Sequence, residues 1–266
     1  MNTLDRFAPI SLDDLVADAA LLTRIDRKYV IDRGDLDAIL TSLDPATRVL
    51  EIDGARTFAY ESVYFDTPDL LSFHLAARPR RRRFKLRTRT YLDVDAAYLE
   101  LKTRGARGTT VKQRSEYDPR LRGELTADAR GDAREALQVI GAGDRADDLT
   151  PALTTRYHRA TLLASSGAAR ATVDTALEWR HPDGDGFALD GLAIVETKSG
   201  SAASDIDRLL WRAGHRPTRV SKYATGLAAL RPDLPRNRWS RLLRERFAPL
   251  NPSSTLSDRL ESSCAA

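Results

Sequence analysis

Basic residues that recur at every second position are the first feature of this sequence that could do chemistry. In the stretch 83–91, Lys85, Arg87 and Arg89 alternate with apolar or neutral residues. The same spacing recurs in 99–104 and 111–116, where the ionic positions are Glu100, Lys102, Arg104, Lys112, Arg114 and Glu116. Because successive side chains of a strand point to opposite faces, each stretch predicts a strand with one ionic face.

Such a face has an ordinary explanation and a functional one. Polar positions of an antiparallel sheet normally face solvent. The short connections 93–96 and 105–108, however, make the three strands consecutive antiparallel neighbours. Like charges set opposite one another destabilise a sheet unless an anion lies among them. The repetition therefore favours a surface that binds a highly phosphorylated ligand.

Composition limits the class of protein. The chain has 266 residues, 42 % hydrophobic and 30 % charged, with a net charge of only +4. That length allows one large domain or two small ones with a sizeable core, and the balanced charge favours local basic patches over a general nucleic-acid coat. The single cysteine, Cys264, excludes an internal disulfide and a Cys-based metal site. With no membrane span and no secretion signal in the sequence, we expect a cytoplasmic protein.

The remaining elements are expected to alternate between short helices and strands. Helices are expected at 11–20, just after 67, at 35–43, 129–140 and 204–214, and up to 230, and further strands at 24–31, 47–53, 56–66, 152–164, 169–177 and 188–198. Asp53-Gly54 predicts a hairpin turn between two of these strands. In many of these short strands the charged residues occupy alternate positions and so share one face. This pattern predicts an α+β fold, a closed antiparallel β-barrel with a charged lumen and surrounding short helices.

Eight short strings occur in the order found in one known family. They are RKY (27–29), SVYFDTPDL (62–70), RFKLRTRTY (83–91), LELKTR (99–104), TPALTTRYHR (150–159), ATVDT (171–175), VETKS (195–199) and SKY (221–223). Over roughly residues 20–232 the sequence resembles the VTC-type polyphosphate polymerase domain, a branch of the triphosphate tunnel metalloenzyme (CYTH-like) superfamily. We therefore expect a tunnel domain at 1–232 and a basic amphipathic helix with a disordered tail at 233–266.

The resemblance implies a closed tunnel that binds ATP, polyphosphate and a divalent metal, Mn²⁺ or Mg²⁺. The terminal phosphate of a growing polyphosphate chain would attack the γ-phosphate of ATP and release ADP. Phosphoryl transfer of this kind needs positioning and charge neutralisation more than covalent help from the protein.

Motif position assigns a role to each basic residue of the tunnel. The expected catalytic residues are Lys28, Arg87, Arg89, Lys102, Arg159, Arg170 and Lys222. Further substrate contacts are expected at Arg83, Lys85, Lys112, Arg114, Lys198 and Arg219, although the upstream family arginine could equally be Arg78. The alternative for each basic site is a salt bridge within the lumen that serves structure only.

Two glutamates are the expected metal ligands. Glu196 of VETK matches the metal-binding glutamate of the family. Glu100 is a second candidate, which could equally be a charge partner of Lys102.

The sequence departs from the wider superfamily at its Glu-x-Glu-x-Lys signature. Arg24, Asp26 and Lys28 occupy those positions here. The first acidic residue of this signature is absent, which weakens the interpretation as a two-metal triphosphatase and favours the VTC branch. Eukaryotic members also carry a phosphate-sensing helical domain and membrane spans, which this sequence lacks, so neither regulation nor product translocation is implied.

The segment 236–250 places Trp239, Leu242, Leu243 and Phe247 on one helical face opposite arginines. This pattern predicts either a helix packed on the barrel or one that docks to a membrane surface or a membrane-protein partner. The Ser-rich stretch 251–266 is expected to be disordered.

Three functional classes remain open from the sequence. They are an ATP-dependent polyphosphate polymerase, a tunnel hydrolase of tripolyphosphate, and a non-catalytic polyphosphate- or nucleotide-binding module of a membrane-associated assembly. Specific nucleic-acid binding is disfavoured, because the aromatic residues do not interleave with the basic strands as a stacking platform requires.

Overall fold

A computed structural model describes residues 3–18, 25–78, 80–105 and 110–247. The expectations for Arg24, the turn at 106–108, Cys264 and the tail 251–266 concern parts outside these ranges. The chain divides into two compact units. Unit 1 comprises 1–59, 157–177 and 189–220, and unit 2 comprises 60–156, 178–188 and 221–266. The expected domain boundary between residues 232 and 233 remains a prediction.

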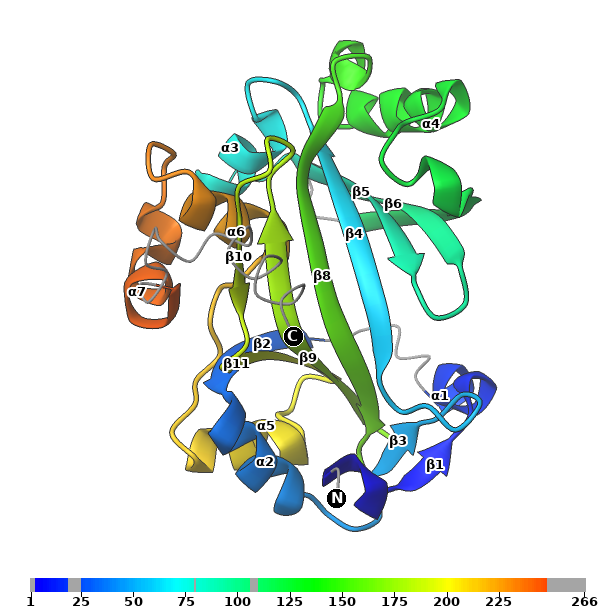
Figure 1. The fold of residues 1–266 in the computed structure, drawn as a ribbon, viewed down its shortest axis with the longest axis vertical. Coiled ribbons are helices and arrows are strands. Elements are labelled where there is room, and N and C mark those ends of the chain that lie inside the picture. Colours follow the sequence, from blue (N-terminus) through cyan, green and yellow to red (C-terminus); the bar gives the residue numbers. More distant parts are fainter. Residues whose placement is uncertain (1–2, 19–24, 79, 106–109, 248–266) are drawn as a thin grey trace, which may run out of the picture. The chain divides into compact units, whose positions relative to one another are not determined.

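One antiparallel sheet dominates the fold, with the strand order β2-β11-β9-β8-β4-β5-β6-β7 (Figure 1). The path ends at β2 and β7, and no backbone pairing joins these two strands in the part of the chain that the structure describes. The α+β class is confirmed, but the expected closure into a barrel is wrong. Closure needs hydrogen bonds between the two edge strands. Strand β7 instead exposes nearly all its side chains, charged ones included, and charged edges keep open sheets from pairing.

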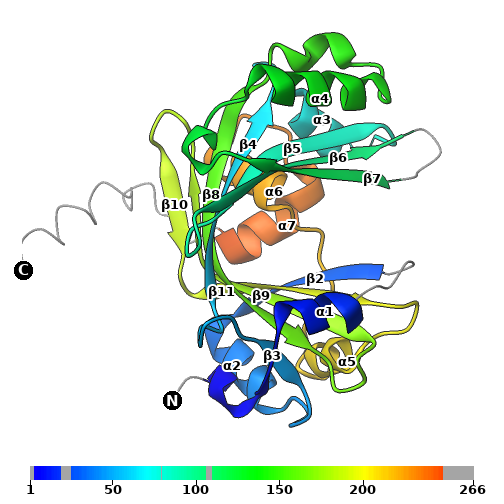
Figure 2. The same ribbon diagram turned by 90° about the vertical axis from the view of Figure 1, so that its right-hand side faces the viewer.

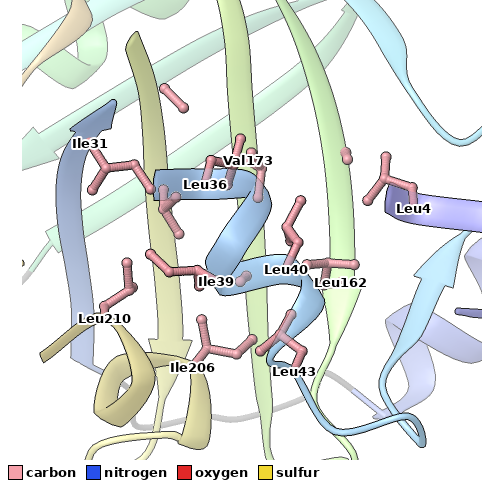
Figure 3. Close-up of a cluster of buried hydrophobic side chains, with 14 of the residues drawn as sticks. Leu4, Ile31, Leu36, Ile39, Leu40, Leu43, Leu162, Val173, Ile206 and Leu210 are labelled. Atoms are coloured by element: carbon pink, nitrogen blue, oxygen red, sulfur yellow. The ribbon is translucent and has the colours of Figure 1, made fainter. Parts of the chain in front are cut away.

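Unit 1 packs two helices on one face of its strands. It contains β2 (Ile25–Asp32), β11 (Leu192–Ser199), most of β9 (Ala169–Arg180) and half of β8 (Thr150–Leu163). Helices α2 (Arg33–Thr41) and α5 (Asp205–Arg212) cover the apolar parity of these strands (Figure 3). The buried cluster includes Tyr29, Ile31, Leu36, Leu40, Val173, Val195, Ile206 and Leu210. The ionic parity of the same strands lies on the opposite face.

Unit 2 repeats this arrangement with another helix. Most of β4 (Phe58–Asp66) is followed by β5 (Arg83–Tyr91), β6 (Ala96–Arg104) and β7 (Thr110–Tyr117). Helix α4 (Ala127–Gln138) packs on their apolar face (Figure 2). The buried cluster includes Val63, Phe65, Phe84, Leu86, Leu99, Leu101, Ala133 and Leu137. Helices α3 (Leu71–Ala77) and α6 (Lys222–Leu230) and strand β10 (Gly186–Leu189) also belong to this unit.

Side chains cap the first turn of several helices. Ser11 Oγ accepts from the Asp14 N–H at 3.1 Å at the start of α1 (Leu12–Asp18). Ser204 and Asp207 form a capping box at α5. Thr67 Oγ1 accepts from the Leu71 N–H at 3.0 Å at the start of α3.

The hairpin predicted at Asp53-Gly54 is only half right. Both residues have positive φ angles, 50° and 78°, as the turn requires. The ladder beyond it, however, is reduced to one bridge between Ile52 and Ala55. Strand β3 (Arg48–Leu50) pairs instead with β8 and, in parallel, with β1 (Ala8–Ile10). This pairing buries Val49 in the core of unit 1, which a two-stranded hairpin could not do.

The segment after α6 packs within unit 2. It forms a 3₁₀ turn (Asn237–Trp239), α7 (Ser240–Leu242) and a π turn (Leu243–Phe247). The Trp239 ring lies 6.0 Å from that of Phe73, and the Phe247 ring lies 5.8 Å from that of Trp179. The apolar face of this segment is therefore buried within the protein, which supports the packing alternative over membrane docking. None of the helices in the described ranges has the length and hydrophobicity that a bilayer span requires.

Candidate functional site

Three lysines form a row across unit 2. Lys85 on β5 lies opposite Lys102 on β6, which lies opposite Lys112 on β7. Residues in such a row share one face, and directly opposed like charges destabilise a sheet. Lys85 Nζ donates to Ser221 Oγ, the N-cap of α6, at 3.1 Å, whereas the side chains of Lys102 and Lys112 are exposed. The row presents positive charge to any anion that approaches this face.

The neighbouring row is built around one carboxylate. Arg87 Nε and Nη2 donate to Glu100 Oε2 at 2.9 and 2.6 Å, and Arg89 Nη1 lies 3.4 Å from Glu100 Oε1. Both oxygens of Glu100 thus face guanidinium groups. This geometry supports the charge-partner role that was the alternative to metal binding, with two arginines as partners.

Tyr64 is a site residue that the sequence analysis did not single out. Its hydroxyl accepts from Arg87 Nη1 at 3.0 Å, and its ring centroid lies 5.6 Å from Arg87 Cζ and 5.8 Å from Lys85 Nζ. It also stacks on Tyr223 of α6 at 5.2 Å. The alternation of β4 did not mark it, because Glu61 of the same strand points to the other face; the pairing with β5 sets Tyr64 opposite Arg87.

Asp66 and Trp179 fix the start of α6, where Lys222 is the first residue. The Tyr223 hydroxyl donates to the buried Asp66, and Trp179 Nε1 donates to the Lys222 carbonyl at 2.7 Å. Asp66 also accepts from the Ser72 N–H of α3 at 2.8 Å. Lys222 is therefore positioned by its backbone within unit 2, while its side chain remains half-buried.

Of the two candidates for the upstream arginine, Arg83 is on the ionic face. It begins β5 opposite Arg104, and burial together with the charges of Arg104 and Arg238 lowers its pKa. Arg78 is the exposed residue that caps the C-terminus of α3. A cation destabilised by its neighbours gains most from an anionic ligand.

Unit 1 carries a second ionic face, with Glu196 between two lysines. Glu196 Oε2 lies 3.4 Å from Lys28 Nζ on the paired strand β2, and its Oε1 lies 3.6 Å from Lys198 Nζ. Burial lowers the pKa of Lys198, which the charge of Glu196 only partly offsets. The register also sets Lys198 opposite Arg170 on β9 and Asp26 on β2.

Arg159 is held by a carboxylate that the sequence analysis used only as a motif marker. Its Nε and Nη2 donate to Asp174 Oδ1 and Oδ2 at 2.6 and 2.8 Å. Burial opposes the charge of Arg159, but the charge of Asp174 raises the pKa of the guanidinium well above its usual value. Arg219 is exposed, and the Thr218 N–H beside it donates to the Lys28 carbonyl at 2.7 Å.

Few of the described side chains could ligate the expected metal ion. Among the described residues, no group of three or more His, Cys, Asp or Glu side chains could hold an ion. Glu196 can offer one carboxylate, whereas both oxygens of Glu100 face arginines. Mg²⁺ is commonly held by one or two carboxylates together with substrate phosphates and water. The donors present fit a cation that is shared with a phosphate ligand at Glu196.

The structure therefore brings the predicted residues together in two groups. Lys28, Arg159, Arg170, Glu196, Lys198 and Arg219 belong to unit 1, and Arg83, Lys85, Arg87, Arg89, Glu100, Lys102, Lys112, Arg114 and Lys222 belong to unit 2. Their roles in catalysis and binding remain predictions.

A comparison with protein-family models matches residues 23–231 to the VTC domain. The chain belongs to the VTC domain family. The match spans all eight motif strings, so the membership predicted from their order is confirmed. A comparison with curated proteins finds no match to this VTC domain.

Solved structures extend the comparison to the fold. A Bacillus halodurans protein described as a candidate adenylate cyclase has a TM-score of 0.50 at 13 % identity, covering 76 % of this chain and 96 % of that one. A Hippeastrum protein, described as a candidate adenylyl cyclase with a dominant triphosphatase activity, has a TM-score of 0.49 at 18 % identity, covering 81 % and 100 %. At such identities the first likeness shows a shared fold alone.

Proposed function

We propose that this VTC domain is a polyphosphate polymerase, which transfers the γ-phosphate of ATP to a growing polyphosphate chain. The observation that carries the proposal is the row Lys85–Lys102–Lys112, set directly beside the clamp of Arg87 and Arg89. Family membership supports a phosphate-related function, and the lysine row supports a polyanionic ligand for it.

The local positive charge of the lysine row is the reason to expect a phosphate chain as the ligand. The protein as a whole has a net charge of only +4, so the concentration of cations on this face is local. A local patch of one sign raises the concentration of oppositely charged substrate. A phosphate chain repeats its charge along its length and would offset the repulsion within the row.

Each group would have a defined task in the transfer. Arg87 and Arg89 would donate to non-bridging oxygens of the triphosphate, and Glu100 holds both guanidinium groups in orientation. A terminal oxygen of the acceptor chain would attack the γ-phosphorus as the bond from that phosphorus to the ADP oxygen breaks. Positioning and neutralisation of charge suffice for this step.

Glu196 is the residue we propose to hold a divalent cation. Mn²⁺ or Mg²⁺, when bound, would neutralise charge on the phosphate oxygens. Lys28 and Lys198 lie 3.4 and 3.6 Å from this carboxylate and would contact phosphates bound on the ionic face of unit 1. Arg159 and Arg170 would add positive charge on the ionic face of unit 1, with Asp174 orienting Arg159.

The test is to incubate the purified full chain with ATP and Mn²⁺ and to follow ADP, free phosphate and polyphosphate separately. ADP with growing chains is the expected result. Free phosphate or pyrophosphate without chains would contradict the proposal in favour of a tunnel hydrolase. Absence of turnover together with tight polyphosphate binding would contradict it in favour of a non-catalytic receptor.

A further inference from the structure

Aromatic side chains gather at one end of the ionic face of unit 2. The Tyr91 ring lies 4.8 Å from that of Tyr60 and 5.7 Å from that of Tyr98. Tyr98 is set opposite Arg89 in the strand register, and Arg89 Cζ lies 5.9 Å from the Tyr60 ring. The expectation that aromatic residues do not interleave with the basic strands is therefore wrong on this face. It failed because these tyrosines become neighbours only when β4, β5 and β6 pair.

Arg114 packs against this group. Its Cζ is 3.6 Å from the centroid of the Tyr98 ring, and its Nη2 donates to the Tyr91 hydroxyl at 3.3 Å. A guanidinium group at this distance over a ring is held by cation–π attraction and stacking. The Arg114 side chain is nevertheless exposed, so a ligand can reach the guanidinium group that Tyr98 backs.

The geometry points to a nucleobase site, in which the base of ATP stacks on the Arg114 guanidinium backed by Tyr98. This inference rests on the proposed use of ATP and adds a subsite to it. Unpaired bases stack on aromatic rings and on arginine planes, and such contacts tolerate any base because each has a π face. An inorganic phosphate chain has no flat apolar group and would gain nothing from such a site.

Distance along the sheet agrees with this assignment. Arg114 lies opposite Glu100, and Glu100 lies opposite Arg87. Two inter-strand spacings therefore separate the Arg114 position from the triphosphate clamp, roughly 10 Å. In a nucleoside triphosphate, the base and the terminal phosphate are separated by the sugar and two phosphates, a span of the same order. A nucleotide could thus engage both groups at once.

The site would also separate donor from acceptor. Both substrates carry phosphate chains, so phosphate contacts alone cannot distinguish them. A stacking contact at one end of the face would let ATP bind in one orientation, with its γ-phosphate directed away from Arg114 and toward the Arg87 clamp.

The experiment compares the affinities of ATP and inorganic tripolyphosphate for the full chain by titration calorimetry in EDTA. Arg114→Lys keeps the positive charge but removes the planar guanidinium group, and Tyr98→Leu removes the aromatic ring behind it. Each should weaken ATP binding by about fivefold to tenfold and change tripolyphosphate binding by less than about twofold. Lys112→Ala, on the same face and strand, should weaken both ligands by a similar factor, because it removes only charge.

Three outcomes would overturn the inference. One is an Arg114→Lys variant that loses affinity for both ligands alike, which would make Arg114 an ordinary phosphate contact. Another is an unchanged ATP affinity in both variants while tripolyphosphate still binds, which leaves the proposed function standing without a base site. If the wild-type chain binds neither ligand, in EDTA or with Mg²⁺ added, the proposed function fails and the base site with it. Because Arg114 is exposed, its lysine variant should fold. A thermal melt is the check that Tyr98→Leu also folds.

Discussion

Glu196 and Lys28 face each other across β11 and β2, with 3.4 Å between Oε2 and Nζ. Lys198 approaches the other oxygen at 3.6 Å. Neither distance is that of a close charge-assisted hydrogen bond, which is nearer 2.8 Å. The carboxylate thus lies between two ammonium groups, each farther away than in a close charge-assisted hydrogen bond.

Replacing Glu196 by Gln keeps the size of the side chain and removes its charge. In the proposed reaction, metal-dependent ADP formation from ATP should fall by at least about 100-fold, because the site loses the negative charge proposed to hold the cation. The melting temperature should stay near that of wild type, since Glu196 lies on the ionic face and not in the core. Wild-type turnover in this variant would remove Glu196 from the mechanism.

Replacing Arg87 by Ala should weaken tripolyphosphate binding by about tenfold to 100-fold, because a charge-assisted contact is lost. Calorimetry on the full chain measures this. Arg134→Ala is the matched control, since Arg134 lies on α4 in an exposed ion pair with Asp147 and should leave the affinity unchanged. Equal losses in the two variants would show that net charge, and not the clamp, determines affinity.

Burial lowers the pKa of Lys198, and this has opposite effects on stability and on binding. Between the folded and unfolded pKa values the folded protein binds fewer protons, so the cost of burying this charge disappears as pH rises. A bound phosphate favours the ammonium form instead. Tripolyphosphate affinity should therefore fall as pH is raised from about 7 toward 10, starting below the ordinary lysine range.

Lys198→Arg provides the comparison, because a guanidinium group stays charged throughout this range. Its affinity for tripolyphosphate should decline less, and at higher pH, than that of wild type. Superimposable pH profiles would show that Lys198 does not contact the ligand.

Asp207 is a buried carboxylate that joins α5 to two strands of unit 1. Its Oδ1 accepts from the Tyr29 hydroxyl at 2.7 Å and from Thr197 Oγ1 at 2.6 Å, and its Oδ2 accepts from the Ser204 N–H at 2.8 Å. Asp207→Asn should lower the free energy of unfolding by about 3 kcal/mol, because the amide cannot accept all of these bonds. Urea unfolding near neutral pH measures the loss.

The pH dependence of this effect has a fixed sign. Burial alone would raise the pKa of Asp207, but hydrogen bonds from Thr197, Tyr29 and Ser204 bring it below its usual value. The stabilisation is present above the unfolded pKa and is lost as pH falls through the folded one, so the difference between wild type and Asp207→Asn should shrink in acid. Asp205→Asn, on the exposed side of the same helix, should change stability by less than about 0.5 kcal/mol.

Two glycine-to-alanine substitutions should have opposite effects. A Cβ at Gly226 in α6 would lie 2.1 Å from Trp179 Cδ1, so Gly226→Ala should destabilise unit 2 by about 1–3 kcal/mol. A Cβ at Gly131 in α4 would meet nothing within 4 Å, so Gly131→Ala should stabilise by about 0.5–1 kcal/mol. Paired unfolding curves test both, and a stabilised Gly226→Ala would contradict the packing of α6 on Trp179.

The alternation of charged and apolar residues along the strands predicted from the sequence which side chains face most of the site. The ionic positions of β5, β6 and β7 share one face as expected, because a period of two is a local property of extended backbone. Which strands pair with one another was less predictable. β3 joins β1 and β8 in place of β4, since burial of Val49 outweighs the local hairpin signal.

By itself, the sequence determined which strand positions are charged and which are apolar and, through the order of its motifs, the VTC family. These follow from residues close together in the chain or from short strings in series. The tertiary structure alone decided that Arg87 and Arg89 share Glu100, that Asp174 holds Arg159 and that Arg114 lies on Tyr98. Such contacts depend on register between strands, which is set by the burial of apolar faces contributed by segments distant in sequence. Among the described residues, the end of the pairing path at β2 and β7 has the same origin, because edge pairing depends on the whole path of strands and not on any one of them.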